Sequence, residues 1–564
     1  MVTDDEPVSD EALRILNVDD LARSGSMNVF GHVLPPRETW PDFLPVPGMD
    51  YPEFMNAAGE LLDRNVQQGR GPHLAIRSRR EELTYAEVLD RVRRLTSALA
   101  QMGVQRGDRV LLRLPNSPEF IIAWLSIVRL GAVVVATVPL LRAAELKAII
   151  DDARVRLAIC QDSLLEDLEK VLPDSSITDV VVTRSRARKF HHFEDCLNFS
   201  PSDHYARTLS DDIAILAYTS GSTGIPKGTV HFHRDIIAIA DTYARFILEP
   251  RPDDVFGGHP SLAFTFGLGG LFVFPFRFGA STVLLEQFSP RELLTAFRDF
   301  GVTIAFCAPT SYKMMLNECG DEIGDYISHL RLCVSAGETL PGSVFTRWAD
   351  RTGLTILDGI GSTEMLHIFI SNRPGDARPQ CTGRPVPGYE AKVVDDQLKE
   401  LPPGTPGMLA VRGPTGCRYW NRPKQQRSYV REGWNFPGDI FVRDEEGYFH
   451  YCCRHDDLII CGGYNIAGPE VENALLQHPA VSEVAVVASP DELRGWVPKA
   501  FIVLAEGYSA DEALARELKE FVKQTIAPYK YPRRIEFVQA LPRTATGKIR
   551  RAELRRREGE RTRS

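Results

Sequence analysis

The sequence predicts an α/β protein in which helices cover largely parallel sheets, followed by a smaller α+β unit at the carboxyl end. Short β-rich runs alternate with helical patterns over most of the chain, which is typical of parallel sheets. Near residue 400 this alternation gives way to a turn-rich texture. The length of 564 residues also exceeds what a single hydrophobic core fills, so more than one domain is expected.

Eight apolar, β-branched runs are the expected strands of the sheets. Between them, residues 85–102 and 291–300 carry apolar side chains at three- and four-residue spacing, which predicts amphipathic helices. The runs are RVLLRL from Arg109, AVVVATV from Ala132, RLAIC from Arg156, DVVVT from Asp179, IAILAYT from Ile213, STVLLE from Ser281, IAFCAP from Ile304 and LRLCVSAG from Leu330.

The longest apolar stretch, residues 120–141, approaches the roughly 20 residues that span a bilayer. It carries Arg129 near its middle with Gly131 close by, and its second half is β-branched. We therefore interpret it as a buried helix followed by a central strand, and we predict no membrane association.

The carboxyl part of the chain is expected to form a separate unit. Prolines and glycines between 402 and 407 open a region of short hairpin-like strands, including GMLAVRG and GYFHY. Two further strands, VSEVAVVAS and KAFIVLAE, then precede a helix over 510–525. We place the domain boundary near Asp456, which divides the chain into 1–455 and 456–564, and expect 1–45 to be a loosely ordered lead.

Composition excludes several classes of protein. A net charge of −9 and a pI near 5.9 argue against nucleic-acid binding, and the basic runs at 184–192 and 548–563 are interpreted as solvated faces. Ten cysteines without framework spacing, and an acidic amino-terminal segment in place of a secretory leader, predict reduced thiols in a cytoplasmic protein. Cys452, Cys453 and Cys461 lack partners at zinc spacing and are expected to be buried apolar side chains.

The most informative motif is YTSGSTGIPKG at 218–228, which follows an apolar strand and precedes a helix-like segment beginning near His231. Its small residues let backbone N–H groups and hydroxyls converge on phosphate oxygens. It is not a P-loop, because Lys227 follows proline and precedes glycine. A plain glycine-rich turn is the alternative, but the interleaved hydroxyl residues and lysine favour a triphosphate site.

This motif resembles the signature phosphate loop of the adenylate-forming superfamily, which includes acyl-CoA synthetases, luciferases and the adenylation domains of peptide synthetases. The resemblance extends over about residues 50–555. It implies a large multi-subdomain amino-terminal domain with a distorted barrel, and a small mobile carboxyl-terminal domain. It also implies that ATP is bound by Thr219, Ser220, Gly221, Ser222, Thr223, Gly224 and Lys227.

The segment GSTE at 361–364 resembles the GxTE motif of the same superfamily. The resemblance implies that Gly361 and Ser362 adjoin the nucleotide, that Thr363 contacts the α-phosphate and that Glu364 helps to hold Mg²⁺. A carboxylate is a hard oxygen ligand that suits this ion. Ile360 stands where many relatives have an aromatic residue against adenine, so we expect the adenine site to depend more on apolar packing and on the segment Ser335, Ala336, Gly337 and Glu338.

Three later segments follow in the order of the superfamily. Gly438 and Asp439 resemble its ribose-binding GD, and Arg454 resembles the arginine that supports the ribose, although Cys453 replaces the usual preceding glycine. Taken alone, Asp439 would be interpreted as a turn or capping residue, but its position in the order of the motifs favours the ribose site. Asp456 matches the hinge. Gly462 and Gly463 resemble the loop beside the pantetheine tunnel for CoA, and PRTATGKIRR carries Lys548 at the position of the mobile catalytic lysine.

These residue types suit the activation of a carboxylate by ATP. Two anions, the carboxylate and the α-phosphate, must approach to bonding distance, so positive charge from magnesium and Lys548 is needed. Lys548 would then obstruct the incoming thiol. The resemblance therefore implies that a rotation about Asp456 withdraws it before CoA reacts.

Within the superfamily, the sequence is most similar to one branch. DGIGSTEMLHIF at 358–369, AFTFGLGG at 263–270 and the lead GHVLPPRETWP resemble benzoate and 2-aminobenzoate CoA ligases. By that resemblance an acid pocket, a flat slot for an aromatic ring, is lined by Phe264, Thr265, Phe266, His367 and Ile368, with Ala336 and Gly361. Thr265 or His367 could meet a polar ortho substituent. The alternatives are a satisfied core histidine and plain core packing of the two phenylalanines.

We therefore expect an AMP-forming aryl-acid CoA ligase, with 2-aminobenzoate as the favoured acid and benzoate or another substituted benzoate as the alternative. Its partners would be the aromatic carboxylate, ATP and CoA, with magnesium as cofactor. Two rival functions remain: an adenylation enzyme that loads a carrier protein, and an inactive acyl or nucleotide sensor. The intact set of Lys227, Glu364, Asp439 and Lys548 argues against the sensor. The sequence does not reveal the oligomeric state.

Overall fold

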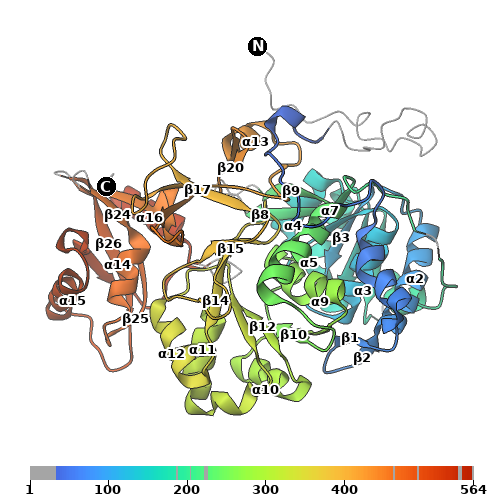
Figure 1. Cartoon of the computed structure of the whole chain (residues 1–564), viewed down its shortest axis with the longest axis horizontal. Helices are drawn as coiled ribbons and strands as arrows, with labels where there is room; N and C mark the ends of the chain where they lie inside the picture. Colours follow the sequence, from blue (N-terminus) through green and yellow to red (C-terminus); the bar gives the residue numbers. More distant parts are fainter. Residues whose placement is uncertain are drawn as a thin grey trace.

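The computed structural model describes residues 33–185, 189–203, 205–220, 226–461, 464–491, 494–543 and 549–561. Two sheets and their helices form most of the molecule, and the orange and red carboxyl-terminal segment forms a separate unit at one side (Figure 1). This is the mixed α/β architecture with a distinct carboxyl-terminal domain that the sequence predicts.

The first sheet has seven strands in the order β7-β6-β5-β3-β4-β8-β9. All its pairings are parallel except that of β8 with β9, which form an antiparallel hairpin. The strands are β3 (Arg109–Arg113), β4 (Val133–Ala136), β5 (Leu157–Gln161), β6 (Asp179–Thr183), β7 (His191–His192), β8 (Ile213–Ser220) and β9 (Pro226–Phe232).

The second sheet has nine strands in the order β16-β15-β14-β13-β12-β10-β11-β1-β2. Its centre is parallel, and antiparallel strands complete both edges. The strands are β1 (Leu74–Arg77), β2 (Glu82–Thr84), β10 (Val255–Gly258), β11 (Ser281–Val283), β12 (Ile304–Cys307), β13 (Leu332–Ser335), β14 (Ile356–Gly361), β15 (Ile368–Ser371) and β16 (Arg384–Pro385).

Helices pack on these sheets around a large shared core, in which the rings of Trp124 and Phe272 meet edge to face at 5.0 Å. The α-helices of this part are α2 (Tyr85–Gln101), α3 (Pro118–Arg129), α4 (Ala143–Ala153), α5 (Leu165–Glu169), α6 (Phe193–Cys196), α7 (His233–Ile239), α8 (Thr265–Leu268), α9 (Phe274–Phe278), α10 (Pro290–Phe300), α11 (Pro309–Cys319), α12 (Gly342–Thr352) and α13 (Pro423–Tyr429). Wider π-helical turns include η7 (Ala240–Leu248) and η8 (Gly269–Val273).

The predicted strands and the long apolar stretch are confirmed. Each of the eight runs covers all or all but one residue of a strand of the two sheets, and residues 120–141 contain most of α3 followed by β4. Arg129 is buried, and its Nη1 donates to both carboxylate oxygens of Asp63 at 2.9 and 2.7 Å. No helix within the described ranges has the length and apolar character needed to cross a membrane.

A third sheet has six strands and is antiparallel, and its strand β18 pairs with three neighbours. Its strands are β17 (Glu390–Val394), β18 (Gly407–Arg412), β19 (Val430–Arg431), β20 (Trp434–Asn435), β21 (Asp439–Arg443) and β22 (Phe449–Arg454).

The carboxyl-terminal unit has its own core and a five-stranded sheet, which follows a short 3-10 helix at His455–Asp457. Arg551 and Glu558 anchor its last helix through ion pairs of 2.7 Å with Glu472 and Lys499. The elements are β23 (Leu458–Cys461), β24 (Tyr464–Ala467), α14 (Gly468–Leu475), β25 (Val481–Asp491), β26 (Gly495–Leu504), α15 (Glu512–Thr525), β27 (Arg534–Phe537) and α16 (Arg551–Arg561). The boundary near Asp456 stays a prediction.

Residues 33–45 differ from the loosely ordered lead that we expected. Val33 and Leu34 are buried, the Trp40 ring lies 5.9 Å from that of Phe232, and Phe43 forms a bridge with Gly413. The apolar side chains of this segment therefore pack on the large domain. Residues 1–32 lie outside the described ranges.

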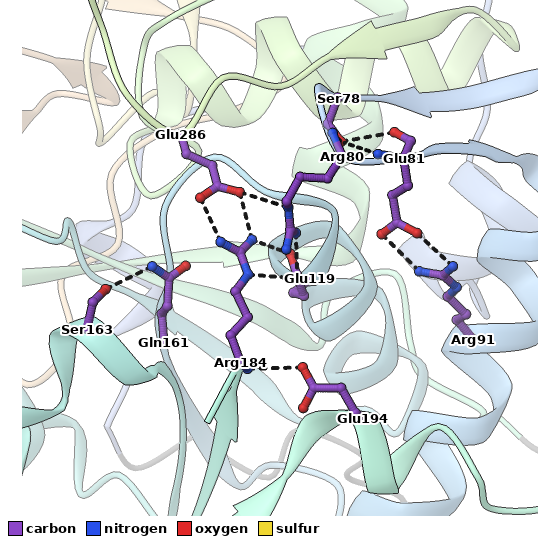
Figure 2. Close-up of polar contacts among 10 residues, drawn as sticks. All are labelled: Ser78, Arg80, Glu81, Arg91, Glu119, Gln161, Ser163, Arg184, Glu194 and Glu286. Carbon is purple, nitrogen blue, oxygen red and sulfur yellow. Dashed lines mark hydrogen bonds and ion pairs between the residues drawn. The ribbon is translucent and has the colours of Figure 1, made fainter. Parts of the chain in front are cut away.

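A cluster of alternating charges joins the two large sheets (Figure 2). Glu119 at the start of α3 accepts hydrogen bonds from Arg80 and Arg184, and Arg184 also pairs with Glu286 beyond β11. Burial opposes ionisation of Glu119, but these hydrogen bonds outweigh burial and lower its pKa to about 2. Arg184 is thus not the solvated residue that we expected from the basic run.

The cysteines are unpaired and mostly buried, as predicted. Cys453 and Cys461 are buried and Cys452 is half-buried. No group of three or more metal-binding side chains is found in the part of the chain that the structure describes.

Candidate functional site

The predicted phosphate loop connects the two strands of the β8–β9 hairpin. Thr219 lies opposite Lys227 and Ser220 opposite Pro226, so the base of the loop is defined. Gly221, Ser222, Thr223 and Gly224 lie outside the described residues.

The helix that we expected near His231 begins instead at His233. The reason is that the β-branched and aromatic residues of 229–232 extend β9 and pair with β8. The loop is therefore a hairpin loop and not a strand-to-helix turn.

The GSTE segment forms a tight turn after β14. The backbone N–H of Met365 donates to Ser362 Oγ at 3.2 Å, and that of Leu366 donates to the Thr363 carbonyl at 3.1 Å. Leu366 adopts a left-handed φ of 68°, which is unusual for a leucine. A Cβ on Gly361 would lie 2.6 Å from the His367 carbonyl oxygen, so this position requires glycine.

A buried histidine fastens this turn to the hairpin. His231 Nε2 on β9 lies 2.8 Å from the Thr363 carbonyl oxygen. Burial lowers the pKa of His231 to about 3, so the ring is neutral at neutral pH and Nε2–H donates to the carbonyl. Thr415 Oγ1 donates to the Met365 carbonyl at 2.7 Å and holds the same turn from the other side.

Two tyrosines that sequence reasoning missed also contact the site. The Tyr419 hydroxyl donates to Glu364 Oε1 at 2.7 Å, and its ring centroid lies 6.0 Å from Lys227 Nζ. The Tyr429 hydroxyl lies 3.3 Å from Ser362 Oγ. Tyr419 is 55 residues from its partner in sequence, and no local pattern marks it.

The two residues predicted to hold the ribose face each other on paired strands. Asp439 on β21 is the register partner of Arg454 on β22, and their side chains form an ion pair of 3.1 Å. Arg454 also donates to the Pro437 carbonyl at 2.7 Å. Gly438, which lies between Pro437 and Asp439 in the sequence, has a left-handed φ of 83°.

The residues predicted for adenine follow β13. Ala336 is buried, and Gly337 has a φ of 89° with no atom within 4 Å of an added Cβ. Glu338 accepts a hydrogen bond of 2.6 Å from Thr310 Oγ1. Ile360, in place of the usual aromatic residue, is half-buried against the core.

His367 lies among aromatic rings. Its ring centroid is 4.6 Å from that of Phe274, 5.3 Å from Tyr243 and 5.9 Å from Phe266. Neither imidazole nitrogen makes a hydrogen bond of normal geometry to a residue in the described ranges, although the nearby Phe266 backbone raises the pKa of the ring in part. Burial lowers its pKa to about 3.

The other predicted pocket residues differ in their exposure. Phe264 is 38% exposed, Thr265 and Phe266 are half-buried, and Ile368 is buried. Phe266 also packs against Phe306 at 5.5 Å between ring centroids. Phe264 is thus not a core residue, whereas Phe266 has part of its surface in the core.

Glycines in the run AFTFGLGG allow this close packing. A Cβ on Gly269 would lie 2.3 Å from His367 Cδ2, and one on Gly270 would lie 2.3 Å from Phe306 Cδ1. Both glycines begin the π-helical turn η8, an element that often occurs at functional sites.

The predicted residues therefore fall into connected groups. Tyr419 contacts both Lys227 and Glu364, and its ring meets that of Tyr429, which contacts Ser362. Thr363 is bonded to His231, on the strand that carries Lys227. Gly462, Gly463 and Lys548 lie outside the described residues, as does the side chain of Asp456.

Comparison with known proteins identifies the family. The profile described as "AMP-binding enzyme" matches residues 62–420, and that of the "AMP-binding enzyme C-terminal domain" matches residues 470–548. The chain belongs to the AMP-binding enzyme family. This confirms the predicted membership of the adenylate-forming superfamily.

The individual relatives that are most informative are CoA ligases of aromatic acids. A benzoate–CoA ligase of Thauera aromatica is 40% identical, over 90% of this chain and 97% of its own length. The structure of an anthranilate CoA ligase in complex with anthranoyl-AMP superposes with a TM-score of 0.85 at 37% identity, covering 90% of this chain and 98% of that one. A benzoate CoA ligase from Burkholderia xenovorans LB400 gives 0.82 at 35% identity, covering 89% and 100%. These similarities confirm the predicted enzyme class, an AMP-forming acid–CoA ligase.

Proposed function

We propose that this chain is an aryl-acid CoA ligase whose preferred acid is 2-aminobenzoate. In the first half-reaction the carboxylate attacks the α-phosphorus of ATP, and an aryl-adenylate and pyrophosphate form. In the second, the CoA thiol attacks the acyl carbon, AMP leaves and aryl-CoA forms. The observation that carries the proposal is the buried His367, whose ring nitrogens make no hydrogen bond of normal geometry to the described residues, within a wall of aromatic rings.

The choice of acid follows from the chemistry of this pocket. Phe266, Phe274 and the neighbouring rings favour a flat aromatic substrate over an alkyl chain. A neutral imidazole offers one donor and one acceptor nitrogen. An ortho amino group can donate to the acceptor nitrogen, whereas benzoate offers that nitrogen no partner, which costs free energy in a buried site. The similarity to an anthranilate ligase also supports the 2-amino acid, since anthranilate is 2-aminobenzoate.

The ATP site is assigned to the residues around the hairpin and the GSTE turn. Lys227, Thr219 and the loop that follows Ser220 would hold the β- and γ-phosphates, and Thr363 would contact the α-phosphate. Asp439 would accept from the ribose hydroxyls, oriented by its pair with Arg454. Ala336, Gly337 and Glu338 would border adenine, where Gly337 leaves open space.

Glu364 fits the role of a magnesium ligand. Its carboxylate is half-buried, one oxygen is held by Tyr419, and hard oxygen donors of this kind suit Mg²⁺ bound with phosphate. The ion, when bound, would neutralise phosphate charge during attack by the carboxylate.

Lys548 and the region around Asp456 are assigned to the change between the two half-reactions. Lys548 would stabilise the negative charge that develops at the α-phosphate. A rotation about Asp456 would then remove it and bring Gly462 and Gly463 to the thiol path. Free CoA is favoured as the acceptor over a carrier protein because of the similarity to CoA ligases over nearly their whole length.

The test is acid-dependent pyrophosphate release with 2-aminobenzoate, benzoate and octanoate, with and without CoA. We expect the highest kcat/KM for 2-aminobenzoate, a lower value for benzoate and almost none for octanoate. In His367→Leu the preference for 2-aminobenzoate over benzoate should fall by roughly 10-fold, the value of a lost hydrogen bond to the substrate. An unchanged ratio, or a preference for octanoate, would contradict the assignment of the acid.

A further inference from the structure

We infer that Tyr419 is a positioning residue for ATP activation: it orients Glu364 for a divalent cation and keeps the Lys227 ammonium apart from that carboxylate. The inference rests on the proposed function, because it assigns Lys227 and Glu364 to the same nucleotide. It concerns one tyrosine that lies between a cationic and an anionic side chain of the site.

The backbone around Tyr419 is fixed against the strand that carries Lys227. Tyr419 forms a bridge with Thr229, and the carbonyl of Arg418 accepts from the Val230 N–H at 2.8 Å. On the other side, the Tyr419 N–H donates to Gln426 Oε1 at 2.9 Å. The phenol ring therefore has a fixed origin beside the phosphate-loop hairpin, and it is buried apart from a small fraction.

The neighbouring Arg418 strengthens this attachment. Its guanidinium is fully buried, pairs with Asp235 and lies 4.1 Å from the centre of the Phe232 ring. Arg418 and Tyr419 are adjacent in sequence, so this anchor limits the movement of the Tyr419 backbone as well. The position of the Tyr419 hydroxyl is thus set by the scaffold, before any nucleotide binds.

That hydroxyl holds one oxygen of Glu364. The O–H···O distance of 2.7 Å is typical of a hydrogen bond to a carboxylate. Tyr419 is the hydrogen-bond partner of Glu364 among the described residues, and it contacts Oε1, which leaves Oε2 for another ligand. A neutral phenol donor orients the carboxylate without cancelling its charge, as an ammonium group would. Hydrogen-bonding partners of this kind commonly tune the affinity of metal-binding carboxylates.

The aromatic ring of Tyr419 separates the Lys227 ammonium from the Glu364 carboxylate. Lys227 Nζ lies 6.0 Å from the ring centroid, at the outer limit of a cation–π contact. Among the described residues, Glu364 and Lys227 make these contacts with Tyr419 and no ion pair with each other. A direct pair would neutralise both groups before they met the cation and the phosphates. The aromatic ring thus acts as a spacer that keeps both charges available.

Tyr419→Phe isolates the hydroxyl, because it keeps the ring. Binding of a non-hydrolysable ATP analogue would be measured by calorimetry over a range of Mg²⁺ concentrations, without acid or CoA. We expect the Mg²⁺ concentration for half-maximal binding to rise about 10-fold or more, as when an outer partner of a metal ligand is lost. Binding of the analogue without Mg²⁺ should change by less than about 2-fold, since the spacer remains.

Tyr85→Phe is the matched control. Tyr85 is also buried, and its hydroxyl donates to the Ala280 carbonyl at 2.7 Å, on a helix far in sequence from the site. This variant should bind analogue and Mg²⁺ like the wild type. Melting temperatures of both variants report any general loss of stability.

A double-mutant cycle with Glu364→Gln decides whether Tyr419 acts through Glu364. In the Glu364→Gln background, Tyr419→Phe should have no further effect on the Mg²⁺ dependence. A Tyr419→Phe variant with the Mg²⁺ dependence of the wild type, or with additive effects in the cycle, would overturn the inference. Failure of the wild type to activate any aryl acid would instead contradict the proposed function. The Mg²⁺ titration of analogue binding would still test the role of Tyr419, because it contains neither acid nor CoA.

Discussion

His231 on β9 and Thr363 in the GSTE turn are joined by a hydrogen bond of 2.8 Å, although 132 residues separate them in sequence. The bond ties the turn predicted to meet the α-phosphate to the strand that follows the predicted phosphate loop. Its donor is a neutral imidazole, because burial lowers the pKa of His231 to about 3.

Removal of this donor should disturb the turn more than the fold. In His231→Ala the Thr363 carbonyl loses its partner, and adenylate formation should slow by about 10-fold, in line with the loss of a buried hydrogen bond. His231→Gln can place an amide donor near the Nε2 position and should recover much of the rate. Pyrophosphate release under single-turnover conditions measures both variants, and equal rates for alanine and glutamine would contradict this role.

Acid should destabilise the protein over the range in which histidines normally titrate. Burial lowers the pKa values of His231, His233 and His367 from 6.5 to about 3, and that of His259 to about 4. Unfolded chains therefore bind more protons than the native state between these values, and stability falls as pH falls from about 6.5 toward 3. Each histidine contributes a slope of roughly 1.4 kcal/mol per pH unit at most.

Asp358 opposes part of this effect, because burial raises its pKa to about 8 and the native state keeps its proton. Its contribution to stability grows as pH falls from about 8 toward 4. Burial also raises the pKa values of Asp108 and Asp212, but the four histidines, together with the lowered pKa of Glu119, leave a net loss of stability on acidification. We expect a lower melting temperature at pH 5 than at pH 7 by differential scanning calorimetry, and a smaller difference in His367→Leu. Equal melting temperatures at the two pH values would contradict the prediction.

Gly269→Ala should affect the acid site selectively. The new methyl group would lie 2.3 Å from the His367 ring, so the imidazole must move. We expect kcat/KM for 2-aminobenzoate to fall by roughly 100-fold, as for a misplaced substrate-positioning group. Calorimetric binding of the ATP analogue should be retained.

Gly59→Ala is the control, because nothing lies within 4 Å of its added Cβ and its φ is not left-handed. This variant should keep wild-type kinetics. Similar losses in both glycine variants would show that the effect is not specific to the pocket.

Lys548→Ala should separate the two half-reactions. Loss of the cation at the α-phosphate is expected to slow adenylate formation by about 100-fold or more. Transfer to CoA from supplied aryl-adenylate should continue at nearly the wild-type rate, because Lys548 is assigned no part in it. Rapid-quench measurement of each step tests this division, and equal losses in both would refute it.

Local sequence patterns predicted the strands well, because a buried parallel strand needs a continuous β-branched run. The stretch 120–141 could be divided into a helix and a strand for the same reason: Arg129 ends α3 and AVVVATV contains β4. The pattern was misleading at His231. There, strand β9 continues through Thr229 to Phe232, and the helix begins only at His233.

Contacts between distant segments could not be predicted in the same way. Tyr419 reaches Glu364 through pairing of its backbone with β9, and no spacing in the sequence encodes that pairing. Similarly, the burial of Val33 and Leu34 depends on a surface that is built by later parts of the chain. The order of the motifs in the sequence was enough to predict which residues form the candidate site. The contacts between those residues could be identified only from the structure.

The most direct test of the account is a single turnover of the wild-type protein with ATP, Mg²⁺ and 2-aminobenzoate in the absence of CoA. We predict a burst of pyrophosphate stoichiometric with protein, a bound 2-aminobenzoyl-adenylate detectable by mass spectrometry, and its conversion to 2-aminobenzoyl-CoA and AMP when CoA is added. Release of ADP and phosphate, or no burst with any aryl acid, would contradict the account.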